Sequence, residues 1–187
     1  MFARKKKYYL FIENINSLNL NLIKQKNKYI IIYRNNNVAE DINLLKKYRV
    51  NCKNKSIAFY VANDLKLAIK IKADGLYLSS FNKKHISKGK LNLIGSAHNF
   101  NEIRQKINQG CSNIILSRLF KTDYKNKNSF LGIVKFNLIS KLVNIRLVPL
   151  GGIRISNLNK LKIVDSNTFA VLSEIKKKPT NLISRLF

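Results

Sequence analysis

The sequence predicts an α/β protein folded as a parallel (β/α)8 TIM barrel with shortened helices and loops. The first observation is a set of eight apolar runs, each four to six residues long. These runs are nearly continuous rather than alternating, which is typical of strands buried on both faces of a parallel sheet. The second observation is that amphipathic stretches lie between most of the runs. Strand–helix alternation of this extent favours a closed barrel or an open doubly wound sheet.

The segment after the first apolar run favours the closed barrel. An open nucleotide-binding sheet should carry a glycine-rich phosphate loop there, but residues 11–20 contain no glycine. The chain also lacks a repeat at a solenoid period and a linker rich in Pro, Gly or Ser. We therefore expect a single barrel domain over residues 1–187. This length is below the roughly 250 residues typical of such barrels, so the helices and loops must be short.

The eight predicted strands are rich in Ile, Val, Leu, Tyr and Phe. They cover residues 8–13, 29–33, 57–61, 75–78, 91–95, 113–117, 146–150 and 168–173. The connections predict helices over residues 38–48, 64–71, 99–109, 135–142 and 156–161. Asn99 and Ser156 are of the residue types that cap helix N-termini. Residues 14–28 predict a weak helix, and residues 78–91 leave room for a turn of helix at most.

The charge is strongly basic, with 36 Lys plus Arg against 9 Asp plus Glu and a formal net charge of +27. A hydrophobic fraction of 45% excludes a disordered polycation. Nucleic-acid binding is the obvious interpretation of the charge, but the lysines are scattered and no recognition motif is present. We retain it as an alternative and prefer small anionic substrates as partners.

The chain has no apolar run near the roughly 20 residues that span a bilayer. Its cysteines, Cys52 and Cys111, lie far apart without metal-site spacing. We therefore expect a cytoplasmic protein with no membrane partner. The sequence leaves open whether it forms a homo-oligomer.

Polar residues come directly after most of the apolar runs, where the active sites of barrels lie. They include Arg34, Asn63, Ser79, Ser96, His98 and Arg118. The pair Gly151-Gly152 comes after the seventh run, and Ser173 ends the eighth. Backbone amides at these positions would form a phosphate pocket, because small residues let a phosphate approach the backbone. A glycine turn between strand and helix is the alternative.

Five segments resemble motifs of the thiamine phosphate synthase and TenI family. In chain order they are LAIKIKADGLYL (67–78), IGSAHN (94–99), LFKTDYK (119–125), LGGI (150–153) and FAVLSEI (169–175). The resemblance implies a transferase that joins hydroxymethylpyrimidine diphosphate to a thiazole phosphate, releasing diphosphate with Mg²⁺. The diphosphate leaves a pyrimidine carbocation, which the thiazole nitrogen traps. Such a site must stabilise a highly charged leaving group.

The resemblance also implies roles for individual residues. The phosphate-binding positions would be Arg34, Asn36, Thr122, Gly151, Gly152 and Ser173. The catalytic positions would be Ser96, His98, Arg118 and Lys125. Asn36 stands where the family usually has lysine. His98 is a candidate general base, with a structural role at the turn after the fifth strand as the alternative.

The metal positions depart most from the family pattern. The two carboxylates expected to hold Mg²⁺ fall on Asn63 and Asn82, unless a gap of one residue restores an Asn63-Asp64 pair. Mg²⁺ prefers carboxylate oxygens, so this change should weaken metal binding. A TenI-like thiazole tautomerase, or a non-catalytic thiazole or thiamine phosphate binder, is therefore the alternative function. TenI's basic histidine corresponds here to Arg118.

Overall fold

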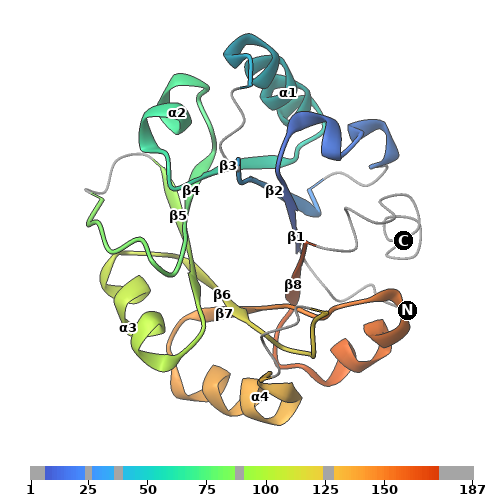
Figure 1. Cartoon of the computed structure of the whole chain (residues 1–187), viewed down its shortest axis with the longest axis vertical. Helices are drawn as coiled ribbons and strands as arrows, with labels where there is room; N and C mark the ends of the chain where they lie inside the picture. Colours follow the sequence, from blue (N-terminus) through green and yellow to red (C-terminus); the bar gives the residue numbers. More distant parts are fainter. Residues whose placement is uncertain (1–6, 24–26, 36–39, 87–90, 124–128, 173–187) are drawn as a thin grey trace.

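The structure is a computed structural model that describes residues 7–23, 27–35, 40–86, 91–123 and 129–172. Its strands form one closed barrel in which every neighbouring pair is parallel (Figure 1). The strands are β1 (Lys7–Ile12), β2 (Tyr29–Tyr33), β3 (Ala58–Ala62), β4 (Gly75–Leu78), β5 (Asn92–Ala97), β6 (Asn113–Ser117), β7 (Arg146–Leu150) and β8 (Thr168–Val171). The predicted (β/α)8 fold is thereby confirmed, with each apolar run forming one strand.

Several strand ends of β1, β3, β5 and β8 differ by one or two residues from the prediction, and two of them are informative. β5 continues through Ser96 and Ala97, which look like turn residues by composition but pair with Ile115 and Leu116 of β6. β1 begins at Lys7 because it closes the barrel against β8, with Lys7 opposite Thr168. In both cases, pairing with a neighbouring strand lengthens the strand beyond the residues whose own composition favours β-structure.

Helices cover the outside of the barrel as short elements. They are α1 (Ile42–Asn54), α2 (Leu65–Lys70), α3 (Phe100–Asn108) and α4 (Gly132–Leu142). α1 begins later than predicted because the Asp41 carboxylate accepts a hydrogen bond from the Asn43 backbone at 2.7 Å. In this described part, no helix is long and apolar enough to cross a membrane.

Two predicted helices were wrong in type. Residues 14–28 contain, where described, two short 3₁₀ turns, η1 (Ile15–Ser17) and η2 (Leu20–Leu22). The connection to β8 is the 3₁₀ segment η3 (Ile155–Ile163). Ser156 does not cap it, since the Arg154 backbone donates to Asn157 Oδ1 at 2.8 Å instead. Between β4 and β5, the described residues 79–86 and 91 contain no helix.

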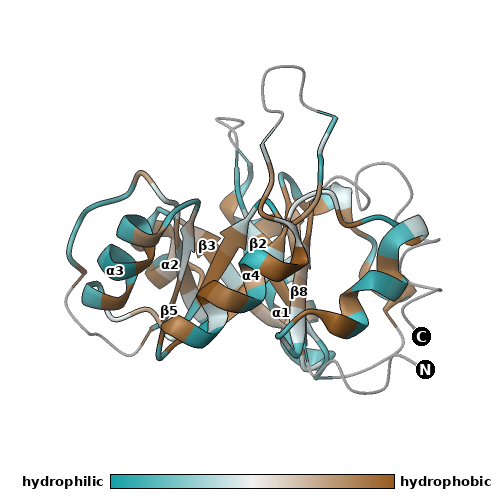
Figure 2. Ribbon diagram, turned by 90° about the horizontal axis from the view of Figure 1, so that it is seen from below, coloured by the Kyte–Doolittle hydropathy of each residue, from teal (hydrophilic) through white to brown (hydrophobic). Residues whose placement is uncertain are grey.

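The core has two layers, because successive side chains of a strand point to opposite faces. One layer fills the barrel interior and includes Phe11 and Tyr77, whose rings meet edge to face at 5.3 Å between centroids. The other lies between the strands and the helices. Figure 2 shows this distribution, with apolar colour on much of the strands and polar colour on α3 and the loops.

The Ala73-Asp74-Gly75 motif lies at the amino-terminal end of β4, where it serves packing. Asp74 accepts hydrogen bonds from the Phe59 backbone at 2.8 Å and from Arg49 Nη2 at 2.9 Å. A β-carbon at position 75 would lie 2.1 Å from a ring carbon of Tyr60. This part of the family-like pattern therefore holds the barrel together, at the end opposite to the strand ends that carry the predicted site.

We expect the protein to lose stability in alkaline solution through its two buried, free cysteines. Burial raises the pKa of Cys52 from 9.0 to about 12 and that of Cys111 to about 11. A pKa raised by folding gives stability that is complete below pH 9.0 and is lost as the pH rises towards the folded value. Each cysteine should cost about 1.4 kcal/mol per pH unit above its unfolded pKa. Denaturant unfolding from pH 8 to pH 10.5 should therefore give a shallower pH dependence for Cys52→Ala/Cys111→Ala than for the natural protein, and equal slopes would contradict it.

Candidate active site at the carboxyl end of the barrel

A cavity of about 590 Å³ opens at the carboxyl ends of the strands. Its lining comes from the strands β4 to β8 and from the residues that come after β2 and after β4 to β8. The strand alternation explains its polar character. Ile32, Tyr77 and Ile94 point into the barrel, so the residues two positions later reach the same side at the mouth. Those residues are Arg34, Ser79 and Ser96, and all line the cavity.

Tyr77 forms part of the cavity wall and was not predicted as a site residue. Burial raises its pKa, while a hydrogen bond with Ser96 and the positive charge of Arg34 act in the opposite direction. The phenol is therefore protonated at neutral pH and serves as a hydrogen-bonding group. The sequence could have indicated Tyr77 as a site residue, because it lies two positions before Ser79 and side chains two positions apart on a strand share one face.

Arg118 enters the cavity from the end of β6. Its Nη1 donates to Thr122 Oγ1 at 3.2 Å, which joins two predicted site residues. Its Cβ and Cγ each lie 2.9 Å from where a β-carbon of Gly151 would be. The arginine stem thus lies against the glycine backbone, and its guanidinium group lies beside the loop after β6. Lys125, on that loop, lies outside the described residues.

The glycine pair comes after β7 in backbone conformations that favour glycine, with φ of 101° at Gly151 and 65° at Gly152. The chain after β6 runs beside it, because Phe120 donates its backbone N–H to the Gly151 carbonyl at 3.0 Å. A β-carbon on Gly152 would lie 2.4 Å from the Lys121 carbonyl oxygen. Both glycines line the cavity, so the turn required for loop packing also leaves space for a ligand. Asn36 and Ser173, the other predicted phosphate ligands, lie outside the described residues.

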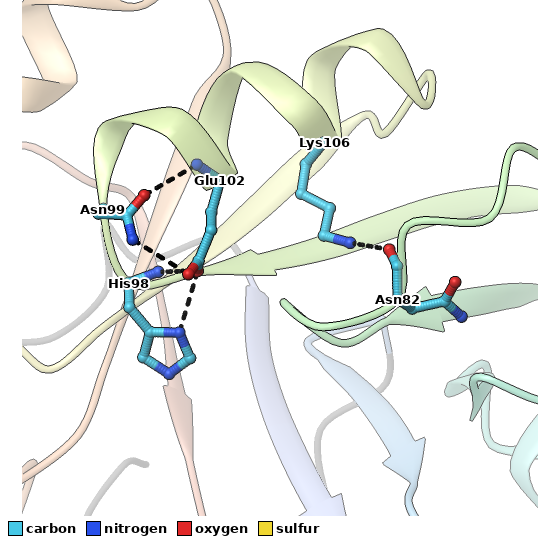
Figure 3. A network of polar contacts seen from close by, with 5 residues as sticks. All are labelled: Asn82, His98, Asn99, Glu102 and Lys106. Atoms are coloured by element: carbon cyan, nitrogen blue, oxygen red, sulfur yellow. Dashed lines mark hydrogen bonds and ion pairs between the residues drawn. The ribbon is translucent and has the colours of Figure 1, made fainter.

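His98 is held in place by Glu102 (Figure 3). The Glu102 carboxylate accepts a hydrogen bond from the His98 backbone N–H at 2.7 Å and lies 3.1 Å from His98 Nδ1. Asn99 caps α3 as predicted, accepting from the Glu102 N–H at 2.9 Å. These contacts fit the structural role that is the alternative to a general base for His98, and the residue also lines the cavity. The role of Glu102 was missed, although Asn99-x-x-Glu102 is a capping-box spacing.

Asn63 and Asn82 lie together and contact each other outside the cavity lining. Asn63 Oδ1 accepts hydrogen bonds from the Ser79 N–H at 2.9 Å and from Asn82 Nδ2 at 3.2 Å. Asn63 Nδ2 donates to Ser79 Oγ at 2.7 Å. Asp64 does not join them, because its carboxylate caps α2 through the Leu67 N–H at 2.9 Å. We call Asn63, Ser79 and Asn82 the amide bridge.

A model of the family described as "Thiamine monophosphate synthase" matches residues 12–175 of the chain. The chain belongs to this family. The family resemblance seen in the sequence motifs is thereby confirmed.

Relatives within the thiamine monophosphate synthase family are distant. The thiamine-phosphate synthase of Prochlorococcus marinus is 30% identical over 129 residues, which are 66% of this chain and 37% of that protein. This chain thus spans little more than a third of that relative. The thiamine-phosphate synthase of Pelagibacter ubique is 26% identical over 150 residues, covering 75% of this chain and 72% of that protein. The solved thiamine phosphate pyrophosphorylase from Pyrococcus furiosus superposes over both whole chains with a TM-score of 0.76 at 19% identity. That likeness concerns the fold.

The residues at the family's metal positions do not fit Mg²⁺. The described residues contain no group of three or more His, Cys, Asp or Glu side chains that could hold a metal ion. The amide bridge offers neutral oxygens that already accept hydrogen bonds. A hard divalent cation requires several oxygen ligands, of which carboxylates are the most favourable. These positions therefore do not supply a site through which Mg²⁺ could act.

Proposed function

We propose that this protein is a transferase of thiamine biosynthesis that joins hydroxymethylpyrimidine diphosphate to thiazole phosphate. The observation that carries the proposal is the cavity at the carboxyl end of a barrel that belongs to the thiamine monophosphate synthase family. Its described lining contains Arg34, Arg118 and several serines but no Asp or Glu. Such a lining favours an anionic phosphorylated substrate.

The two arginines are proposed to bind the diphosphate of the pyrimidine substrate. A guanidinium group can donate two parallel hydrogen bonds to phosphate oxygens and remains charged at every relevant pH. Thr122 restrains Arg118 through the 3.2 Å hydrogen bond. When the carbon–oxygen bond to diphosphate breaks, both electrons leave with the diphosphate. The arginines would stabilise that added negative charge.

The interior side of the cavity is proposed to hold the two rings. Ala170 and Leu150 are apolar, and Tyr77 and Ser96 supply hydroxyl groups. Because the phenol of Tyr77 is neutral, it can orient a ring nitrogen without taking a proton. The Gly151 and Gly152 amides, with Ser173 as expected from the sequence, would hold the thiazole phosphate. Lys125 and His98 stay candidates for further contacts with the substrate at the mouth. A cytoplasmic location belongs to the same proposal.

The test is formation of thiamine phosphate from the two substrates by purified protein, followed by chromatography. Parallel reactions contain millimolar Mg²⁺ or EDTA. We expect product, and the Arg34→Ala/Arg118→Ala variant should form far less because both guanidinium groups are gone. Absence of product in both buffers, with protein that is shown to be folded by circular dichroism, would contradict the proposal.

The amide bridge favours a second candidate function, a metal-free thiazole tautomerase or thiazole phosphate binder. A tautomerase moves a proton within the thiazole ring system and does not release diphosphate. The same protein preparation can be tested with thiazole carboxylate phosphate by monitoring isomerisation. Isomerisation without synthase activity would favour this candidate over the transferase.

A further inference from the structure

We propose that the cavity binds the diphosphate group without a divalent cation, because the amide bridge occupies the positions that correspond to the family's metal ligands. The inference rests on the proposed function, since it concerns the substrate of the same cavity. Three features of the chain support it: the occupied amide oxygens, a buried lysine behind them, and the way in which nearby carboxylates are used.

The acceptor oxygens of the amide bridge are occupied within the protein. Asn63 Oδ1 accepts from two donors, and Asn82 Oδ1 accepts from the Lys84 backbone N–H at 3.0 Å. Asn63 is further held through its backbone, since its N–H donates to the Tyr77 carbonyl at 2.8 Å. A cation would have to displace these donors to gain neutral ligands. The hydrogen bonds instead tie the end of β3 to the end of β4, which is the connection that a shared metal would otherwise make.

Lys106 places a positive charge behind the amide bridge. Its side chain is buried and lies across Gly95, whose β-carbon position would be 2.7 Å from Lys106 Cγ. The Nζ group donates to the Asn82 carbonyl at 2.7 Å and to Gln109 Oε1 at 2.9 Å (Figure 3 shows the first of these). An ammonium group in this place repels a second cation, and it also occupies a carbonyl that could have served as a metal ligand.

Three carboxylates that come after β3, β5 and β6 have partners within the protein. Asp64 caps α2, Glu102 accepts hydrogen bonds from His98 and Asn99, and Asp123 forms an ion pair with Arg154. The cavity itself is lined by Arg34, Arg118 and His98. The two guanidinium groups therefore balance much of the negative charge of a diphosphate, and a bound Mg²⁺ would compete with them for the same oxygens.

The test is calorimetric binding of inorganic pyrophosphate to the natural protein, once in EDTA and once in millimolar Mg²⁺. We expect binding in EDTA and equal or weaker affinity in Mg²⁺, because Mg²⁺ also complexes free pyrophosphate. In Asn63→Asp/Asn82→Asp we expect binding in EDTA to weaken by about 100-fold, through repulsion by two new carboxylates, and Mg²⁺ to restore at least about tenfold of it.

A matched control adds the same charge elsewhere. Asn144 and Asn167 are exposed residues before β7 and β8, at the opposite end of the barrel. Asn144→Asp/Asn167→Asp should bind pyrophosphate nearly as the natural protein does, in either buffer. A loss of binding equal to that of the site variant would mean that net charge alone sets affinity, which would overturn the role given to the amide positions.

The outcomes separate the two proposals. Binding of pyrophosphate by the natural protein only in Mg²⁺ overturns the metal-free inference and leaves the proposed function standing. Binding in neither buffer overturns both, since the anion pocket itself would then be absent. The measurement on the natural protein decides the matter even if the site variant fails to fold.

Discussion

Replacing Gly152 by alanine is expected to lower the free energy of unfolding by about 3 kcal/mol or more. The new β-carbon would lie 2.4 Å from the Lys121 carbonyl oxygen and 2.6 Å from that of Phe120. Both neighbours are backbone atoms, so no side-chain rotation can relieve the contact. The chain after β6 must move, and the Arg118–Thr122 arrangement at the cavity should move with it. Urea unfolding measures the first effect, and calorimetry with pyrophosphate measures the second.

Gly132→Ala is the matched control for this substitution. Gly132 has a similar positive φ of 72°, but no atom lies within 4 Å of its β-carbon position. Its replacement should cost only the backbone preference, about 1 kcal/mol. The difference between the two variants isolates the close approach of the loop. Equal losses of stability would show that loop contact with Gly152 contributes nothing.

Replacing Arg118 by alanine is expected to weaken pyrophosphate binding by about 100-fold, which corresponds to about 2.7 kcal/mol. The guanidinium group lines the cavity at the end of β6 and is restrained by Thr122. Arg118→Lys should recover part of the affinity, because the charge remains while the forked donor geometry is lost. Calorimetry at two salt concentrations should also give a smaller salt dependence for the alanine variant.

Arg146→Ala removes the same charge at the far end of the barrel, since Arg146 is exposed at the start of β7. This control should bind pyrophosphate with nearly natural affinity. If both alanine variants lose affinity equally, long-range charge rather than a local contact accounts for anion binding. If neither loses affinity, Arg118 has no part in the site.

Much of the barrel could be predicted from the sequence because each strand is a continuous apolar run. β2, for example, is Tyr29–Tyr33 in the prediction and in the structure. The position of Arg34, Ser96 and Arg118 in one cavity could also be predicted, because parallel strands place their carboxyl ends on the same side and barrel active sites lie there. Asn99 was predicted as a cap because its side chain and the spacing to Glu102 are local properties.

The rest depends on contacts between residues distant in sequence. The 3₁₀ segment η3 is an exception, because its start is set by short-range hydrogen bonds of Asn157 with the Arg154 N–H and the Gly152 carbonyl, which apolar spacing does not report. The charged side chain of Lys106 favours the surface, yet the space over Gly95, which has no side chain, buries it. The contact of Asn63 with Asn82 depends on how β3 and β4 pair, which single-residue propensities do not report.

Side chains at the carboxyl-terminal end of α3 form hydrogen bonds with the connection between β4 and β5. Lys106 and Gln109 together bond the Asn82 carbonyl, and Gln109 Nε2 also donates to the Lys84 carbonyl at 2.7 Å. These two long side chains therefore satisfy backbone carbonyl groups of the β4–β5 connection, whose described residues contain no helix. A longer, helical connection would remove the carbonyl groups that these two side chains bond, so the short connection and the two long side chains depend on each other.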